Sequence, residues 1–98
     1  MVRWTRSGRI APGKELQAIQ WAKELTAWAN KKYGGHLSVY MDCFGEVGTV
    51  RFFDDFENLA DLETKLQQVM ADQEYWQKIS PAPTLFQGVA VDTVMATL

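Results

Sequence analysis

The side chains in this sequence that could do chemistry are few, and its only histidine, His36, is the first to consider. An unperturbed imidazole changes its charge near neutral pH, so a general base is sought there before anywhere else. His36 follows Gly34 and Gly35 directly at the expected start of a strand, and no carboxylate stands beside it in the sequence. We therefore expect a structural or solvent-facing histidine rather than a catalytic one.

A second group of residues combines aromatic rings with cations. Tyr40 and Arg51 face each other across an expected hairpin, and Trp4 and Arg6 have like parity on an expected neighbouring strand. Together they would form an aromatic wall with a cationic end, which suits a carboxylate or phenolate ligand. The alternative is that they pack a subunit interface, with Arg51 paired to Asp42 or to an acidic residue across it. We favour the interface, because arginine and aromatic residues are enriched in interface cores.

The remaining clusters favour structural roles. Trp21 and Trp28 lie seven residues apart, on one side of an expected helix and about 10 Å from each other, so we expect core packing. Asp54, Asp55 and Glu57 suit the start of a helix, and we assign no metal to them. No phosphate-binding loop, nucleophile elbow or His-Glu-x-x-His motif occurs, and we expect no cofactor.

Length and composition limit the class of protein. The 98 residues are 47% hydrophobic and 22% charged, which predicts one globular domain over residues 1–98. Ten basic and twelve acidic residues, with no basic block, argue against nucleic acid as a partner. The apolar runs are too short to cross a membrane or to form a signal peptide. A single cysteine, Cys43, fits a reducing compartment, and we expect a cytoplasmic protein.

Hydrophobic periodicity predicts the order strand, helix, hairpin, helix, strand. Apolar residues at spacings of three and four mark the first helix, and Gly34 suits its left-handed end. Asp55 is the expected N-cap of the second helix, with Glu57 in its first turn. The expected strands cover residues 2–10, 36–42, 49–54 and 89–95; the expected helices cover 14–33 and 55–72, with a further turn or two within 74–80.

The hairpin register follows from placing apolar residues opposite apolar residues. This rule sets Val39 opposite Phe52 and Met41 opposite Val50, and therefore Tyr40 opposite Arg51. One face of the sheet is then aliphatic and lies under the helices.

The opposite face of the sheet is expected to carry Trp4, Tyr40 and Phe53. An apolar patch of this kind is uncommon on a monomer, and a second identical subunit is the simplest cover for it. We expect a homodimer; the alternative is a monomer with a mixed outer face.

Four stretches resemble the dimeric α/β barrel superfamily, which includes the antibiotic-biosynthesis monooxygenases and the NIPSNAP-like proteins. They lie within residues 11–14, 44–49, 55–59 and 71–76, and the likeness spans nearly the whole chain. The resemblance implies an α+β, ferredoxin-like βαββαβ subunit whose antiparallel sheet has two helices on one face. It also implies that two such sheets close into a homodimeric barrel, with a pocket between each sheet and its helices.

The resemblance does not select a reaction, because superfamily members range from cofactor-free oxygenases to haem degraders. Trp28, Tyr40 and Asn30 are the available counterparts of the residues with which the monooxygenases hold an aromatic substrate. The haem degraders use an asparagine on the first strand and a histidine on the second helix, and this chain has neither. Haem degradation by that arrangement is not expected.

Three hypotheses of function follow. The first is a small-molecule-binding or purely structural homodimer. Its ligand, a small aromatic compound, would contact residues drawn from Trp4, Trp28, His36, Tyr40 and Arg51. The second is a cofactor-independent monooxygenase acting on an aromatic or quinol-like substrate, which predicts an enclosed pocket reached by Trp28, Tyr40 or His36. The binding protein predicts a pocket without a titratable group beside it. The third, a protein interaction module, predicts no pocket and an apolar patch left over after dimerisation.

Overall fold

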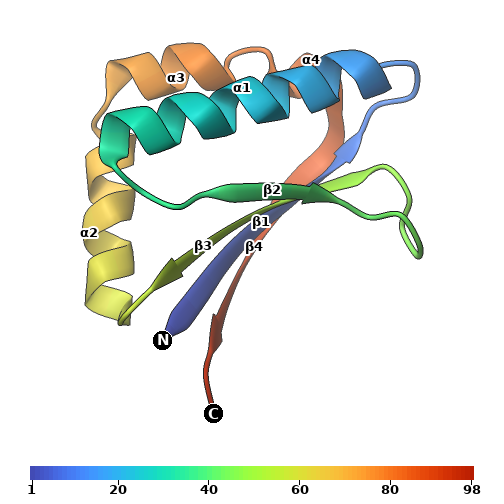
Figure 1. Ribbon diagram of the computed structural model, residues 1–98. Helices are drawn as coiled ribbons and strands as arrows, with labels where there is room; N and C mark the ends of the chain where they lie inside the picture. The colour runs from blue at the N-terminus through green and yellow to red at the C-terminus, as the bar shows by residue number, and fades with distance from the viewer.

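The computed structural model describes residues 1–98 as one four-stranded sheet with its helices gathered on one side (Figure 1). Every neighbouring pair of strands is antiparallel, and the strand order is β2-β3-β1-β4. The α+β, ferredoxin-like fold expected from the sequence is therefore confirmed. The elements are β1 (Val2–Ile10), α1 (Glu15–Tyr33), β2 (Ser38–Met41), β3 (Thr49–Phe56), α2 (Leu59–Met70), α3 (Gln73–Ile79), α4 (Ala82–Leu85) and β4 (Phe86–Ala96).

The hairpin register is confirmed. Val39 pairs with Phe52 and Tyr40 pairs with Arg51, so the aliphatic face lies under the helices. Strand β2 begins two residues later than expected, because the side chain of Asn30 bonds both backbone groups of Leu37. The Asn30 amide donates to the Leu37 carbonyl over 2.9 Å, and the Leu37 N–H donates to Asn30 Oδ1 over 2.7 Å.

Helix α1 packs on the sheet through two small residues, Ala18 and Ala22, both buried. It ends at Tyr33, and Gly34 closes it with a positive φ of 66°, which a residue with a Cβ adopts only with strain. The hydrophobic core below α1 consists of Ile10, Ala18, Ala22, Val50, Phe52 and Leu85. Only nine of the 98 residues are buried and no large side chain is fully buried, so this core fills little of the space between sheet and helices.

The predicted start of the second helix is wrong. Strand β3 continues to Phe56 because β1 pairs with it as far as Val2. Asp55 therefore lies within the strand, where its carboxylate accepts two hydrogen bonds from Arg3. Glu57 precedes α2, and the N-cap is Asn58, whose Oδ1 accepts a hydrogen bond of 2.9 Å from the Asp61 N–H.

The region after α2 also differs in detail from expectation. Helix α2 ends at Met70, and Asp72 caps the separate helix α3, which supplies the further turns expected there. The short helix α4 follows Pro81 and was not expected. Strand β4 is longer than expected at both ends, because it pairs with β1 along most of its length around an irregularity near Gly88.

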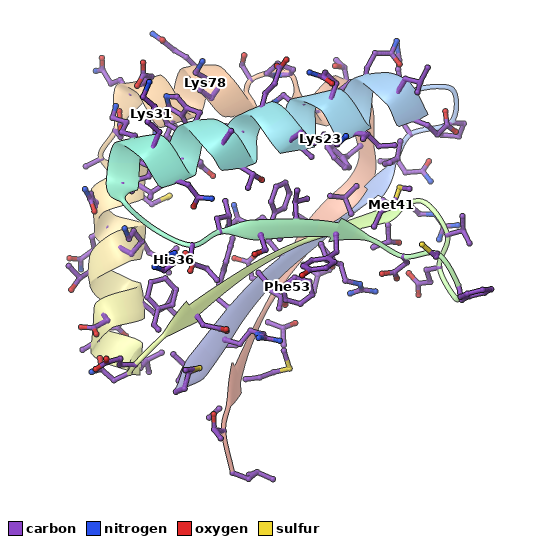
Figure 2. The ribbon with its side chains drawn as sticks, viewed as in Figure 1. Lys23, Lys31, His36, Met41, Phe53 and Lys78 are labelled. Carbon is purple, nitrogen blue, oxygen red and sulfur yellow. The ribbon has the colours of Figure 1, made fainter.

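The prediction that Trp4 lies on the outer face of the sheet is wrong. Trp4 pairs with Asp54 and alternates with Thr5, which pairs with Phe53, so Trp4 points to the helix side and Phe53 points away from it. Figure 2 shows Phe53 on the side of the sheet opposite α1, whereas Lys23, Lys31 and Lys78 point outward from the helix layer. The outer aromatic pair is Tyr40 and Phe53, whose rings lie 5.5 Å apart.

Strand β4 is an edge strand with unusual exposure. It has β1 on one side and no strand on the other, and all its residues after Phe86 are exposed. Among them are Val89, Val91, Val94 and Met95, so apolar side chains meet solvent along an unpaired edge. Such an edge pairs readily with another chain unless it is covered. No helix of this chain has the length and apolar character required to span a bilayer.

The corrected N-cap gives a test of the fold. Replacing Asn58 with alanine leaves the Asp61 N–H without its side-chain acceptor, and we expect a loss of about 1 kcal/mol in the free energy of unfolding. Urea denaturation followed by circular dichroism measures it. Glu57→Ala is the matched control and should change stability much less; an equal loss in both variants would contradict the assigned cap.

Candidate functional site

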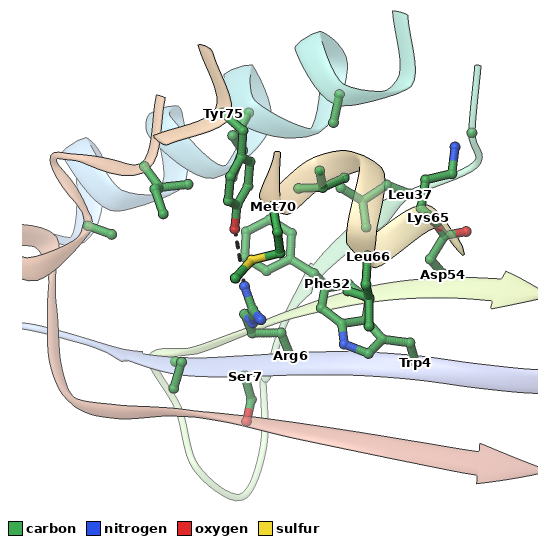
Figure 3. A pocket seen from close by; sticks show the side chains of 18 of the residues that line it. Trp4, Arg6, Ser7, Leu37, Phe52, Asp54, Lys65, Leu66, Met70 and Tyr75 are labelled. Atoms are coloured by element: carbon green, nitrogen blue, oxygen red, sulfur yellow. Dashed lines mark hydrogen bonds between the residues drawn. The ribbon is translucent and has the colours of Figure 1, made fainter. Parts of the chain in front are cut away.

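A partly open cavity of about 480 Å³ lies between the sheet and the helices. Its lining is mostly apolar and comes from three strands and all four helices. The large apolar side chains include Trp4 from β1, Trp21 from α1, Phe52 and Phe56 from β3, Leu66 and Met70 from α2, and Phe86 from β4. Figure 3 shows Trp4, Phe52, Leu66 and Met70 around this space. Its volume lies within the usual range for small-molecule sites, about 300–1,000 Å³.

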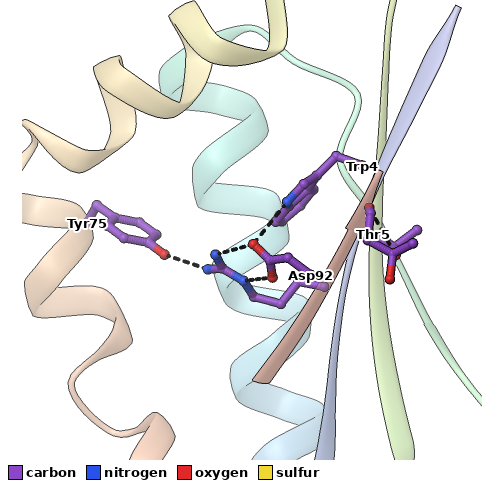
Figure 4. A network of polar contacts seen from close by, with 6 residues as sticks. Trp4, Thr5, Tyr75 and Asp92 are labelled. Atoms are coloured by element: carbon purple, nitrogen blue, oxygen red, sulfur yellow. Dashed lines mark hydrogen bonds and ion pairs between the residues drawn. The ribbon is translucent and has the colours of Figure 1, made fainter. Parts of the chain in front are cut away.

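One polar network borders the cavity (Figure 4). Arg6 donates two hydrogen bonds to the Asp92 carboxylate, of 2.7 and 2.9 Å, and a third of 3.3 Å to the Tyr75 hydroxyl. The indole N–H of Trp4 donates to the same carboxylate over 3.3 Å. The Arg6 guanidinium also lies 5.3 Å from the centre of the Trp4 ring. The network thus joins β1, β4 and α3 beside the cavity.

The charges of this network cancel. The hydrogen bonds from Arg6 hold the pKa of Asp92 below its usual range, and those to Asp92 raise the pKa of Arg6. Arg6 is therefore engaged with a carboxylate and is not a free cation for an anionic ligand. The Tyr75 hydroxyl accepts a bond from Arg6, and its own proton has no acceptor in the protein. The network can therefore offer a ligand one neutral donor.

A second polar group lies at another part of the lining, where Figure 3 shows Asp54 and Lys65 close together. Lys65 donates a hydrogen bond of 3.0 Å to the Tyr33 carbonyl and lies over the Tyr33 ring. Asp54 makes no ion pair within 4.0 Å, unlike Asp42, Asp55, Asp72 and Asp92. Burial raises the pKa of Asp54, and the nearby charge of Lys65 opposes that rise.

Of the five residues predicted from the sequence to bind a ligand, Trp4 alone lines this cavity. Trp28 lies on the side of α1 that faces α3, where its indole N–H donates to Glu74 over 3.2 Å. The ammonium groups of Lys32 and Lys78 lie 5.4 and 5.8 Å from the centre of the Trp28 ring. These contacts give Trp28 a role in joining two helices.

The other three, His36, Tyr40 and Arg51, lie together in an open cleft on the outer face of the sheet. Arg51 donates two hydrogen bonds of 2.9 Å to Asp42, as the interface interpretation predicted, and the pKa of Asp42 is lowered as a result. The cationic end expected for a carboxylate ligand is therefore already paired. Trp4 and Arg6 lie on the opposite side of the sheet, so the four residues cannot form one wall.

The structure also reveals residues that the sequence did not single out. Tyr75 and Asp92 reach Arg6 from positions 69 and 86 residues away, and no local pattern predicts such contacts. Asp92 faces inward because it pairs with Arg6 of β1, whose side chain lines the cavity. Asp54 was assigned to a helix start, which concealed its inward position on β3.

The cavity discriminates among the three hypotheses only in part. An interaction module predicted no pocket, and one is present. The oxygenase predicted a pocket reached by Trp28, Tyr40 or His36, and none of them lines the cavity. The binding protein predicted no titratable group beside its pocket, yet Arg6, Asp54, Lys65 and Tyr75 are all present.

Comparison with solved structures places the fold. A NIPSNAP family protein of Agrobacterium tumefaciens superimposes with a TM-score of 0.83 at 16% identity, covering 99% of this chain and 92% of that one. A NIPSNAP domain protein of Burkholderia xenovorans superimposes with a TM-score of 0.80 at 15% sequence identity, covering 100% of this chain and 95% of that one. An antibiotic biosynthesis monooxygenase superimposes with a TM-score of 0.74 at 12% sequence identity, covering 100% of this chain and 99% of that one. The resemblance drawn from the sequence is thus confirmed for the fold. No protein-family model and no curated protein matches the chain.

The Arg6 network predicts a measurable contribution to stability. Asp92→Asn keeps the side-chain shape but leaves the Arg6 guanidinium without a charged acceptor in a half-buried place. We expect a loss of about 1 kcal/mol, the usual value for such a bond after discounting for partial exposure. Urea unfolding at neutral pH measures the loss. Asp55→Asn removes the charged partner of Arg3, which is more exposed than Arg6, and should lower the free energy of unfolding by less. A larger loss in Asp55→Asn than in Asp92→Asn would contradict this ranking.

Proposed function

We propose that this protein binds a small, apolar, neutral molecule with an aromatic ring in the cavity between its sheet and helices. The observation that carries the proposal is the combination of a cavity of about 480 Å³ with a mostly apolar lining. A closely packed interior has few spaces larger than a water molecule, so an apolar space of this size between sheet and helices is the default candidate for a ligand site.

The lining indicates the chemistry of the ligand. Trp4, Trp21 and Phe52 provide aromatic surfaces that pack edge-on or offset against another ring. Both guanidinium groups that the sequence offered to an anion are engaged by aspartates, which disfavours an anionic ligand. The unpartnered proton of the Tyr75 hydroxyl suits a carbonyl or ether oxygen.

The oxygenase alternative was built on Trp28, Tyr40 and His36, and it loses them because they do not line the cavity. A similar fold is not by itself an argument for the same reaction. We therefore base the proposal on binding alone.

We further propose that the working form is a homodimer in which a second copy covers the outer face of the sheet. Tyr40 is 63% exposed there, beside Phe53, and Val91 and Met95 continue the apolar surface onto β4. With so few buried residues, a single subunit has a small core for a chain of this length. A two-fold interface needs only one self-complementary patch, and the exposed apolar side chains of this face support its use as that patch.

Binding is tested with N-phenyl-1-naphthylamine, a neutral apolar dye whose emission rises in apolar surroundings. Leu66→Trp fills part of the cavity, and we expect affinity for the dye to fall about tenfold, equivalent to about 1.4 kcal/mol. Leu59→Trp is the matched control, since Leu59 is exposed on the same helix and does not line the cavity. Equal affinity in both variants and the unmodified protein would place the dye elsewhere and contradict the proposal.

The dimer is tested by sedimentation equilibrium. We expect a mass of twice the 11.1 kDa chain at micromolar concentration, and a shift toward the single-chain mass when Val91 and Met95 are both replaced with lysine, because charge is costly in an apolar interface. Leu16→Lys, at an 83% exposed position of α1, should leave the mass unchanged. A single-chain mass for the unmodified protein would rule out the dimer.

A further inference from the structure

Asp54 is the only residue that lines both the inner cavity and the cleft on the outer face of the sheet. It lies near the end of β3, opposite Trp4 of β1, and its carboxylate is close to Gly35 in the segment between α1 and β2. Its carboxylate therefore lies at the point where the apolar interior and an open, polar surface come closest. No other side chain in the protein has this position.

The surroundings of Asp54 leave its oxygens without a charged side-chain donor within 4.0 Å. Lys65 of α2 comes near but donates to the Tyr33 carbonyl, and Asn30 of α1 donates to and accepts from the backbone of Leu37. On the outer side lie His36 and Asp55, and Asp55 is held by Arg3. The other carboxylate beside the cavity, Asp92, is held by Arg6 and Trp4. Asp54 is thus the one carboxylate here without a charged donor bonded to it.

A carboxylate in this setting suits proton transfer. Partial burial removes water from its oxygens and raises its pKa toward the range in which a general base works well. Three groups oppose this rise in the pKa of Asp54: the Asp55 backbone N–H, Lys65 and His36. The charge of the Asp55 carboxylate adds to the rise. Structural carboxylates in this protein show the opposite behaviour, since their arginine or lysine partners lower the pKa.

We propose that Asp54 is a general base that takes the proton of a weakly acidic hydroxyl, phenolic or enolic, on the molecule bound in the cavity. This inference rests on the proposed binding function and adds a substrate class to it. The O–H bond of the ligand breaks, the proton bonds to an Asp54 carboxylate oxygen, and the electron pair stays on the ligand oxygen. The Lys65 ammonium stabilises that oxygen. Asp54 then loses the proton to water in the outer cleft, where His36 lies.

The test uses 2-naphthol, which becomes a strong acid when excited by light and then emits at a longer wavelength if it has passed its proton to an acceptor. Bound in the cavity of the unmodified protein, it should show the naphtholate band. Asp54→Asn should bind it with similar affinity and lose that band, because the amide cannot accept the proton. The neutral 2-methoxynaphthalene, which has no proton to give, should bind both forms equally.

Asp55→Asn is the matched control, since Asp55 is the next residue on β3 but lines only the outer cleft. It should keep the naphtholate band. In the unmodified protein the band should disappear as the pH falls, because Asp54 must be ionised to accept a proton, with a midpoint above that of an ordinary aspartate. Thermal unfolding of both variants checks that they are folded; removal of a half-buried charge should not destabilise the Asp54→Asn variant.

The outcomes separate the two proposals. If neither naphthalene compound binds the unmodified protein, the binding function fails and the general base fails with it. If both compounds bind and the naphtholate band survives in Asp54→Asn, the cavity binds ligands but Asp54 is not the proton acceptor. A band lost equally in Asp55→Asn would also overturn the assignment.

Discussion

The double pairing of strand β1 is the constraint on which the rest of the structure depends. β1 is hydrogen-bonded to β3 on one edge and to β4 on the other, so its register fixes the direction of every side chain on three strands. A slip of one residue would exchange the two faces. Trp4 and Arg6 would then leave the cavity, and the Arg6 contacts with Asp92 and Tyr75 would be lost.

The same pairing explains how a small core coexists with a large cavity. Ile10, Val50 and Ala22 pack closely at one end of the sheet, near the start of α1 and the short helix α4. Toward the other end, α2 carries Leu66 and Met70 beside the cavity, and the polar network of Arg6 supports the space between sheet and α3. Stability is concentrated where the layers touch, and the remaining space is available to a ligand.

The sequence was sufficient where neighbours in space are also near in the chain. The hairpin register followed from the apolar residues of two strands separated by one loop, and the end of α1 followed from Gly34. The sequence was insufficient where two local choices were equally good, as for Asp55 and Asn58, both favourable caps. It failed for the parity of Trp4 and the inward position of Asp92, because only pairing between the two ends of the chain decides them.

Asp54 differs from the aspartates that pair with arginines across the strands of this sheet. Arg3, Arg6 and Arg51 each donate two hydrogen bonds to one aspartate, so both faces of the sheet are nearly neutral at these points. A sheet built in this way has no need of an unpaired carboxylate in its interior, and partial burial of one is unfavourable. Asp54 is such a carboxylate, and it lies where the cavity and the outer cleft meet. Packing and arginine pairing do not account for this carboxylate, and this is the reason for proposing that it contacts a hydroxyl of a bound molecule.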